Sequence, residues 1–259
     1  MIQFQYTRKQ LRRYPFKSVL YDFLYAHVLH NLPRSKQSIF IRWRLALSLV
    51  GVDFHIEKIQ KRRHEIEALC NPELRLKYGL EKLVSKTDIP RILDIGAGPV
   101  SKVGWRTEAG SVDLVPVDPL AKKYKSLLIQ EQLRPPIWTI RGNGEKLATD
   151  HDAGSFDLIH ARNCIDHCLN PMDVIKQAIK VLKPDCSLYM NHYRNEGKKA
   201  SYYGLHQWNF DKVNGKFVIT DYYGETVDVG AAISDVAEVA SLSLAAGRVI
   251  VIIKKHKAD

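Results

Sequence analysis

The stretch Arg91-Ile-Leu-Asp-Ile-Gly-Ala-Gly-Pro99 decides the fold, because it leads from an apolar strand straight into a glycine turn. Gly96 and Gly98 have no Cβ, so the backbone can turn tightly there and approach a ligand closely. We expect a helix at about 100–108 to follow, with its free N–H groups aimed at that ligand. Pro99 stands where a dinucleotide-binding fingerprint would continue to its third glycine, so a pyrophosphate ligand fits poorly.

Short apolar runs alternate with helical patterns after this turn. The expected strands are RILDI, VDLVPVD, PIWTIRG, FDLIHA and CSLYMNH, with further helices at about 120–132 and 171–182. This alternation implies a parallel sheet with helices on both faces. AEVASLSL, the turn AAGR and VIVIIKK then indicate an antiparallel hairpin. The predicted fold class is α/β, with a Rossmann-like, mostly parallel seven-stranded sheet that ends in an antiparallel hairpin.

The first third of the chain carries nearly all of its excess charge. Residues 1–86 contain 17 Lys and Arg against 7 Asp and Glu, which is +10 of the chain's net +11. We therefore divide the chain into a basic N-terminal helical extension, 1–86, and an α/β domain, 87–259. The charge favours an anionic partner, whether nucleic acid, a lipid surface or a phosphorylated substrate. A helical cap with a solvated basic face explains it equally well.

Four helices are expected in the extension. They begin after Pro15, after Ser38, at Asp53 and at Asn71, which precedes Pro72. Their expected inward-facing residues are Phe16, Val19, Leu20, Phe23 and Leu24; Ile39, Trp43, Ala46, Leu47 and Val50; and Leu76, Leu80, Leu83 and Val84. We expect these apolar faces to pack onto the α/β domain beside its ligand site.

Polar residues follow the expected strands in order. Asp94 precedes the first glycine by two residues, where a carboxylate can take an ammonium group, and Asp118 ends the second strand, where it can bind ribose hydroxyls. Asn143 and Gly144 end the third strand, where an adenine ring would lie, and Asn163 ends the fourth. Each alone is an ordinary turn residue. Together, at the strand ends where α/β proteins bind ligands, they favour a nucleoside ligand.

DIGAGP, VDPLAKKY, GNGEKL, SFDLIHARNCIDH and VLKPDCSLYM together resemble the successive motifs of class I S-adenosylmethionine-dependent methyltransferases, over about residues 90–192. The resemblance implies an enzyme that uses S-adenosyl-L-methionine and releases S-adenosyl-L-homocysteine. It implies these cofactor residues: Asp94, Gly96 and Gly98 for the methionine end, Asp118 for the ribose, and Asn143 with Gly144 for the adenine; Asn163 completes the predicted set. Asn143 often has an acidic counterpart in the family, and Lys183-Pro184-Asp185-Cys186 replaces the usual Lys-Pro-Gly-Gly. Neither departure removes a group that cofactor binding needs.

Histidines are expected on the acceptor side of the sheet. Methyl transfer to a hydroxyl needs a base, and His167, beside Asp166, and His192 follow the fourth and fifth strands. We take these three residues as catalytic candidates. With His206 and Glu196, the two histidines could instead be metal ligands, as in some metal-assisted O-methyltransferases. Their spacing matches no compact metal motif, so no metal is expected.

The stretch HYRNEGKKASYYGLHQWNF mixes aromatic and polar side chains, which suits a polyhydroxyl ligand. The predicted substrate-binding residues are Glu196, Tyr203, His206 and Trp208. Alternatively, these aromatics only close the core. The segment resembles one in methyltransferase-like proteins of bacterial polysaccharide and lipopolysaccharide biosynthesis, which implies a sugar hydroxyl of a glycan or glycan precursor as acceptor. Residues 212–230 suggest an inserted hairpin without an assigned role.

Two other functions stay open. The basic helices could grip the phosphates of RNA, although no NPPY-type tetrapeptide follows the fourth strand. The chain could also bind the cofactor and a partner without turnover. No apolar run approaches the roughly 18 residues of a membrane helix, and the first residues lack a signal-peptide pattern. Four cysteines without CxxC spacing favour a reduced compartment. We expect a cytoplasmic protein, peripheral at the inner membrane if its acceptor is lipid-linked.

Overall fold

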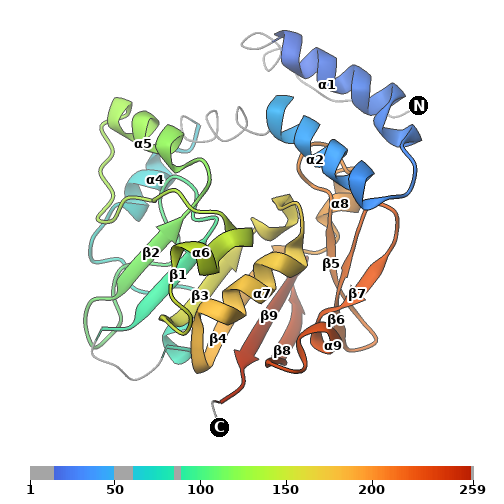
Figure 1. Ribbon diagram of the computed structural model, residues 1–259. Helices are drawn as coiled ribbons and strands as arrows, with labels where there is room; N and C mark the ends of the chain where they lie inside the picture. Colours follow the sequence, from blue (N-terminus) through green and yellow to red (C-terminus); the bar gives the residue numbers. More distant parts are fainter. Residues whose placement is uncertain (1–14, 50–60, 85–88, 258–259) are drawn as a thin grey trace.

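The computed structural model describes residues 15–49, 61–84 and 89–257 and contains a central six-stranded sheet in the order β2-β1-β3-β4-β9-β8. The strands are β1 (Arg91–Ile95), β2 (Asp113–Val117), β3 (Phe156–Arg162), β4 (Leu182–Tyr193), β8 (Ala237–Ala245) and β9 (Arg248–Lys255). Strands β1 to β4 are parallel, and β9 and β8 complete the sheet antiparallel to their neighbours (Figure 1). The predicted fold class, including the closing hairpin, is confirmed.

The seventh expected strand, PIWTIRG, is reduced to one parallel bridge between Val117 and Ile140. The backbone of Ile140 still pairs with β2, because its N–H donates to Pro116 O (2.9 Å) and its carbonyl accepts from Asp118 N (3.0 Å). The segment therefore lies beside β2, but its pairing is too short for the strand that the sequence predicts.

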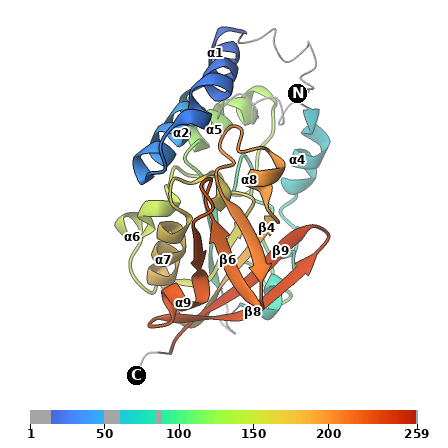
Figure 2. The ribbon, with the colours of Figure 1, turned by 90° about the vertical axis from the view of Figure 1, so that its right-hand side faces the viewer.

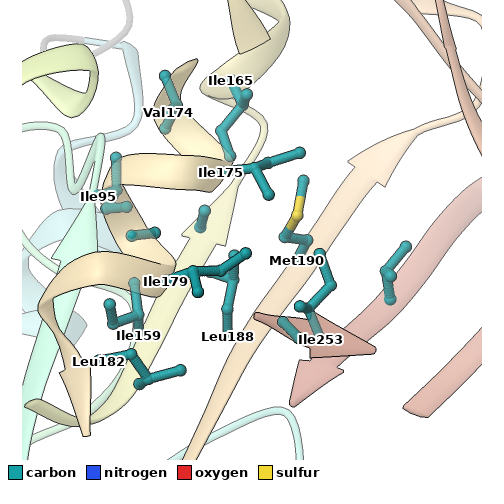
Figure 3. Close-up of a cluster of buried hydrophobic side chains, with 14 of the residues drawn as sticks. Ile95, Ile159, Ile165, Val174, Ile175, Ile179, Leu182, Leu188, Met190 and Ile253 are labelled. Carbon is teal, nitrogen blue, oxygen red and sulfur yellow. The ribbon is translucent and has the colours of Figure 1, made fainter. Parts of the chain in front are cut away.

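Helices cover both faces of the sheet (Figure 2). One face carries α6 (Leu147–Asp150) and α7 (Pro171–Val181), and the other carries α4 (Arg63–Leu69) and α5 (Ala121–Gln130). The Asn170 side chain caps α7 by accepting from Met172 N. The apolar stripe of α7 packs on β1, β3, β4 and β9 in the larger core (Figure 3). Helices α5 and α7 confirm the two downstream helix predictions.

Two predicted helices are absent from the described structure for one shared reason. Residues 71–84 and 100–108 form irregular segments. The only helical turn in either segment is the 3-10 turn η3 (Leu80–Lys82), within residues 71–84. Their backbones pair with each other: Leu76 N donates to Arg106 O (2.8 Å) and Trp105 N to Leu74 O (2.7 Å). At Gly104 a Cβ would lie 2.3 Å from Arg75 O, so the pairing needs glycine there. The expected inward residues of 71–84 still face the second core, because Leu80 is fully buried there.

A second, three-stranded sheet follows β4 and fills the place of the inserted hairpin. It consists of β5 (Asn209–Val213), β6 (Lys216–Thr220) and β7 (Thr226–Asp228), with α8 (Glu196–Lys199) before it and α9 (Val229–Ile233) after it. Phe210, Phe217 and Ile219 join the larger core, on the same face of the central sheet as α7. The insertion therefore belongs structurally to the α/β domain.

Helices α1 (Pro15–His27) and α2 (Lys36–Leu49), joined through the 3-10 turn η2 (Leu29–Asn31), lie together at the end toward which β1 to β4 point (Figure 1). The predicted inward face of α1 is wrong, because Val19 and Phe23 are 55% and 58% exposed. Tyr21 and Tyr25 are buried instead. Their hydroxyls bond to the backbone of 201–204 (Tyr21 Oη accepts from Gly204 N, Tyr25 Oη donates to Ser201 O), which an apolar side chain cannot do.

Helix α2 begins before the predicted cap, since Ser38 N donates to the side chain of Ser35. Its buried face contains Ile39 and Ala46, as predicted, and also Arg42. The predicted third helix starts outside the described residues, and α4 is its described part. Helix α4 packs into the second core of the α/β domain, whereas α1 and α2 form a separate cluster with Tyr203 and Leu205. No helix of the described residues is long and apolar enough to cross a membrane.

Candidate functional site

The glycine turn touches the segment that follows β3. Gly96 and Gly98 have φ values of +64° and +70°, in the left-handed region that favours glycine. A Cβ on Gly96 would lie 2.3 Å from Cys164 Cβ, and the Cys164 thiol donates to Ile95 O (3.1 Å). The turn after β1 and the segment after β3 are therefore in direct contact at the carboxyl edge of the sheet.

Asp118, the predicted ribose ligand, holds the turn against the end of β2. Its Oδ2 accepts from Gly98 N (3.1 Å) and its Oδ1 from Leu120 N (2.8 Å). Burial raises the pKa of Asp118, and these backbone hydrogen bonds oppose the shift. A carboxylate oxygen can accept more than one hydrogen bond, so Asp118 can still take a hydroxyl.

Asp94, the predicted ligand of the methionine ammonium, is buried and already paired. Ser101 Oγ donates to Asp94 Oδ2 (2.7 Å), and His160 Nδ1 lies 2.7 Å from Oδ1. The His160 ring is stacked between Tyr78 and Tyr189. The helix expected after the glycine turn is absent from residues 100–108, so its N–H groups cannot secure the turn. The contacts of Asp94 with Ser101 and His160 secure it instead. The ammonium contact stays a prediction, in which Asp94 would accept one bond more.

The other predicted cofactor residues also make local contacts. Asn143 Oδ1 accepts from Glu145 N (3.0 Å) and caps the 3-10 turn η4 (Gly144–Lys146). A Cβ on Gly144 would lie 3.1 Å from Val174, so little room exists there for a side chain. Asn163 accepts from Tyr193 N and Arg248, which ties β3 to its neighbours. Their contacts with adenine or methionine stay predictions.

The structure brings the acceptor-side residues into one cluster, the Asp166 cluster, made of Asp166, His167, His192 and His206. Asp166 and His167 belong to the 3-10 turn η5 (Ile165–His167), directly after β3. His206 Nδ1 lies 2.9 Å and His167 Nε2 3.4 Å from Asp166 Oδ2, and these two nitrogens are 3.2 Å apart. His192 Nδ1 lies 3.8 Å from the other oxygen, Oδ1. Forty residues of chain thus separate two groups in hydrogen-bond contact.

Burial divides these histidines. The side chains of His167 and His206 are 24% and 33% exposed, whereas that of His192 is 3% exposed. Within the described residues neither His192 nitrogen has a hydrogen-bond partner, and burial lowers the pKa of His192. His192 is therefore buried beside Asp166, and its role as the general base stays a prediction. Burial alone would lower the pKa of His206, but the hydrogen bond and charge of Asp166 raise it.

Asp166 is held ionised by its neighbours. Burial would raise the pKa of this carboxyl, yet the adjacent histidines keep the pKa of Asp166 well below its usual range. Trp43 Nε1 of α2 donates to His167 O (2.8 Å), so the N-terminal helices contact the Asp166 cluster. This contact connects the N-terminal extension to a candidate catalytic residue, as expected if the extension packs beside the site.

The remaining predicted substrate residues make mostly internal contacts. Tyr203 Oη donates to Asp22 Oδ1 of α1 (2.7 Å), and the Tyr203 ring packs edge-on against Tyr21. Trp208 Nε1 donates to Cys168 O (3.0 Å). Glu196 begins α8 and lies close enough for its charge to raise the pKa of His206. The aromatics of this segment thus secure the helices and the core, and an acceptor contact from Tyr203 or Trp208 stays a prediction.

Two arginines that the sequence did not single out lie at the same edge of the sheet. Arg162 ends β3 with its guanidinium over the Tyr78 ring, and Arg248 begins β9 over the Tyr193 ring. Neither forms an ion pair with a carboxylate of the described residues, and Arg162 Nε is buried without a hydrogen-bond partner there. Burial, then the positive charge of Arg162, lowers the pKa of Arg248. The sequence signal that could have identified these two residues is an arginine at the end of an otherwise apolar strand: Arg162 is the last residue of β3 and Arg248 the first of β9.

Comparisons with known proteins find one matching family model and several solved structures of similar fold. Residues 93–190 match the family model of a methyltransferase domain. No curated protein sequence matches the chain. Similar solved structures include a SAM-dependent methyltransferase from Aquifex aeolicus (13% identity, TM-score 0.46, 77% of this chain and 97% of that one). Others are SAM-dependent methyltransferases from Methanosarcina mazei (18%, 0.44, 72% and 100%) and an O-methyltransferase family protein from Burkholderia thailandensis (9%, 0.49, 94% and 71%).

The family match runs from β1 through β4, the strands that carry the glycine turn, Asp118 and the segment leading to the Asp166 cluster. A mostly parallel sheet closed by an antiparallel hairpin accompanies it. Residues 93–190 therefore match a methyltransferase domain, and the sheet that contains them has the fold expected from the resemblance to class I S-adenosylmethionine-dependent methyltransferases.

Proposed function

We propose that the enzyme transfers the methyl group of S-adenosylmethionine to a hydroxyl group of a saccharide. The observation that carries this proposal is the contact between Asp166 Oδ2 and His206 Nδ1 (2.9 Å) at the carboxyl edge of the sheet. When Nδ1–H donates to Asp166, the lone pair of His206 is on Nε2. A partly exposed imidazole oriented by a carboxylate is suited to take the proton of a hydroxyl.

The reaction needs alignment and one proton acceptor. The hydroxyl oxygen attacks the methyl carbon, the new O–C bond forms as the C–S bond breaks, and its electron pair stays on sulfur. The hydroxyl proton passes to His206 Nε2, so the products are the methyl ether, S-adenosylhomocysteine and a protonated imidazole. The contact between Gly96 and Cys164, two residues before Asp166, supports the closeness of the two reactants that this step requires.

We infer that the saccharide carries an anionic group. Arg162 and Arg248 favour a phosphate or carboxylate on the acceptor, because neither half-buried guanidinium is paired with a carboxylate of the described residues, although Arg248 donates to Asn163 and Asn191. The preference for a sugar comes from the resemblance of the segment around Glu196 and His206 to glycan-modifying proteins. Replacing Arg248 by Gln should raise KM for a phosphorylated sugar about tenfold and leave KM for its unphosphorylated analogue unchanged.

A lipid-linked carrier for this saccharide fits the surface of α1 and α2. Val19, Phe23 and Phe40 are exposed apolar side chains on these helices, which also carry the exposed Lys17 and Lys36. Apolar and basic side chains together suit the surface of an anionic membrane, where each basic residue contributes about 1 kcal/mol. Sedimentation with phosphatidylglycerol vesicles should carry the enzyme down at low salt, and Phe23→Asp should weaken this binding. Equal binding by the variant contradicts the proposal.

The decisive experiment is a turnover assay for S-adenosylhomocysteine across four acceptor classes: free sugars, nucleotide sugars, lipid-linked glycans and RNA. The proposal predicts turnover with a saccharide class. Turnover with RNA alone would establish the nucleic-acid alternative. Cofactor binding by calorimetry without turnover on any class would favour the non-catalytic alternative.

A further inference from the structure

We propose that Asp166, His167 and His206 form a binding site for one divalent transition-metal ion. The three candidate ligand atoms, Asp166 Oδ2, His167 Nε2 and His206 Nδ1, lie within 4.8 Å of one another. Their actual separations are 2.9, 3.2 and 3.4 Å. Metal binding itself is independent of the proposed function, whereas the catalytic role derived below depends on it.

The separations match the spacing of ligands around a single ion. Ligand atoms about 2.1 Å from a metal are separated by about 3.0 Å in octahedral and about 3.4 Å in tetrahedral geometry. The triangle formed by the three atoms admits a point about 2.1 Å from each corner, about 1 Å outside the plane of the triangle. By their separations alone, the three atoms can therefore share one ion.

Hydrogen bonds alone cannot make all three contacts among Asp166 Oδ2, His167 Nε2 and His206 Nδ1 favourable. If both nitrogens donate to Asp166 Oδ2, the two N–H groups face each other across 3.2 Å. If His167 donates to His206 Nδ1, that nitrogen has no proton left for the carboxylate 2.9 Å away. At most two of the three contacts can be hydrogen bonds in any arrangement of protons. A cation at the centre makes all three attractive, because each atom then presents a lone pair to it.

The surroundings suit a bound ion that remains open to an acceptor. Asp166 is 7% exposed, while the two histidines are partly exposed, which leaves coordination positions for water or a hydroxyl. His192 lies 3.8 Å from the other carboxylate oxygen, beyond hydrogen-bond distance. Trp43 fixes the backbone of His167. These are the ligand set and the supporting contacts expected around a catalytic metal.

The donor set indicates which ions bind. Two imidazole nitrogens and one carboxylate oxygen suit Zn²⁺, Fe²⁺, Co²⁺ or Mn²⁺, whereas Mg²⁺ and Ca²⁺ prefer oxygen ligands. A bound ion would occupy the Nδ1 lone pair of His206 and leave a proton on Nε2. The ion would then replace His206 in activating the acceptor: it lowers the pKa of a coordinated hydroxyl, whose proton leaves to solvent.

Calorimetric titration of chelator-treated, dialysed full-length enzyme with Zn²⁺, and absorption spectra with Co²⁺, test the site directly. One equivalent should bind, and Co²⁺ should give visible ligand-field bands. His206→Ala and His167→Ala should each weaken binding by more than about 100-fold, beyond the 10- to 100-fold typical of residues outside the ligand shell. His64→Ala, at a 99% exposed side chain on α4, is the matched control and should leave binding unchanged.

The proposal is overturned if no equivalent binds, if His206→Ala binds as tightly as the native chain, or if His64→Ala loses as much affinity. Circular dichroism checks that each variant folds. Turnover measured in parallel separates this proposal from the proposed function. Turnover without metal binding overturns the metal site and leaves His206 as the base. Metal binding without turnover on any hydroxyl acceptor overturns the proposed function and supports the site.

Discussion

The two ends of the parallel sheet's functional edge are built differently. At the β1–β2 end, the glycine turn and Asp118 are joined by contacts across about 20 residues of chain. At the β3–β4 end, Asp166 meets His206 across 40 residues, and Trp43 reaches His167 across 124. The first end depends on strand order alone. The second depends on the segment inserted after β4 and on the N-terminal helices that pack against it.

The largest expected effect of a single substitution is at Arg42, which attaches the N-terminal helices to the β3–β4 end. Its fully buried guanidinium donates to Gln207 Oε1 (3.0 Å) and Leu29 O (2.7 Å) and stacks on the Tyr222 ring. Arg42→Ala leaves these acceptors unpaired beside a cavity and should cost about 3–5 kcal/mol of unfolding free energy. Urea denaturation measures the loss.

The control for this prediction is Arg44→Ala, because Arg44 is exposed on the same helix. It should stay within about 0.5 kcal/mol of the native chain. Similar losses for both variants would show that the burial of Arg42 does not secure the helices.

Alanine substitutions at Gly96 and Gly98 test whether the two ends are in tight contact. Gly96 lies against Cys164 of the β3–β4 end, whereas Gly98 belongs only to the glycine turn. Both have positive φ, so Ala costs about 1–2 kcal/mol of strain at either position. Only at Gly96 would a Cβ meet Cys164, 2.3 Å away, whereas at Gly98 nothing lies within 4 Å. Gly96→Ala should therefore cost about 2–5 kcal/mol in total, by adding overpacking to the strain. Equal unfolding free energies for the two variants would contradict a tight contact between the ends.

Asp118→Ala tests the β1–β2 end by itself. Loss of charge-assisted hydrogen bonds to the ribose should weaken S-adenosylmethionine binding by about 2–3 kcal/mol, or about 30- to 150-fold. Because Asp118 also accepts from Gly98 N, a folded Asp118→Asn variant should be measured alongside it. Calorimetry that finds native cofactor affinity in both variants rejects Asp118 as a ribose ligand.

The smallest effect is expected from charge reversal on α4. Arg62 pairs with Glu65, and Arg63 with Glu131 (3.1 Å), so these charges are already partly neutralised within the protein. Reversal of both arginines should change acceptor KM by less than about twofold, as is usual for exposed ion pairs. A larger change, accompanied by a steep salt dependence, would assign the basic face of α4 to the acceptor.

The sequence predicted the strand ends of the sheet better than the segments that connect the strands, for a physical reason. Strand ends such as Asp118 follow from a period of apolar residues, and parallel strands align those ends automatically. The helices expected at 71–84 and 100–108 failed because their backbones pair with each other, a contact that propensity does not encode. The predicted buried face of α1 was wrong because the hydroxyl of Tyr21 accepts a hydrogen bond from Gly204 N, which favours burial of Tyr21, while Phe23 stays exposed. The contact between His206 and Asp166 could not be predicted without knowing the path of the chain after β4.

The most direct test of the division between the two ends is a single-turnover measurement on His206→Ala, with saturating S-adenosylmethionine and an active acceptor. The account predicts that the rate of S-adenosylhomocysteine formation falls about 100- to 10,000-fold, while the dissociation constant for S-adenosylmethionine changes less than twofold. A rate within a few-fold of the native enzyme, or an equal loss of cofactor affinity, would contradict it.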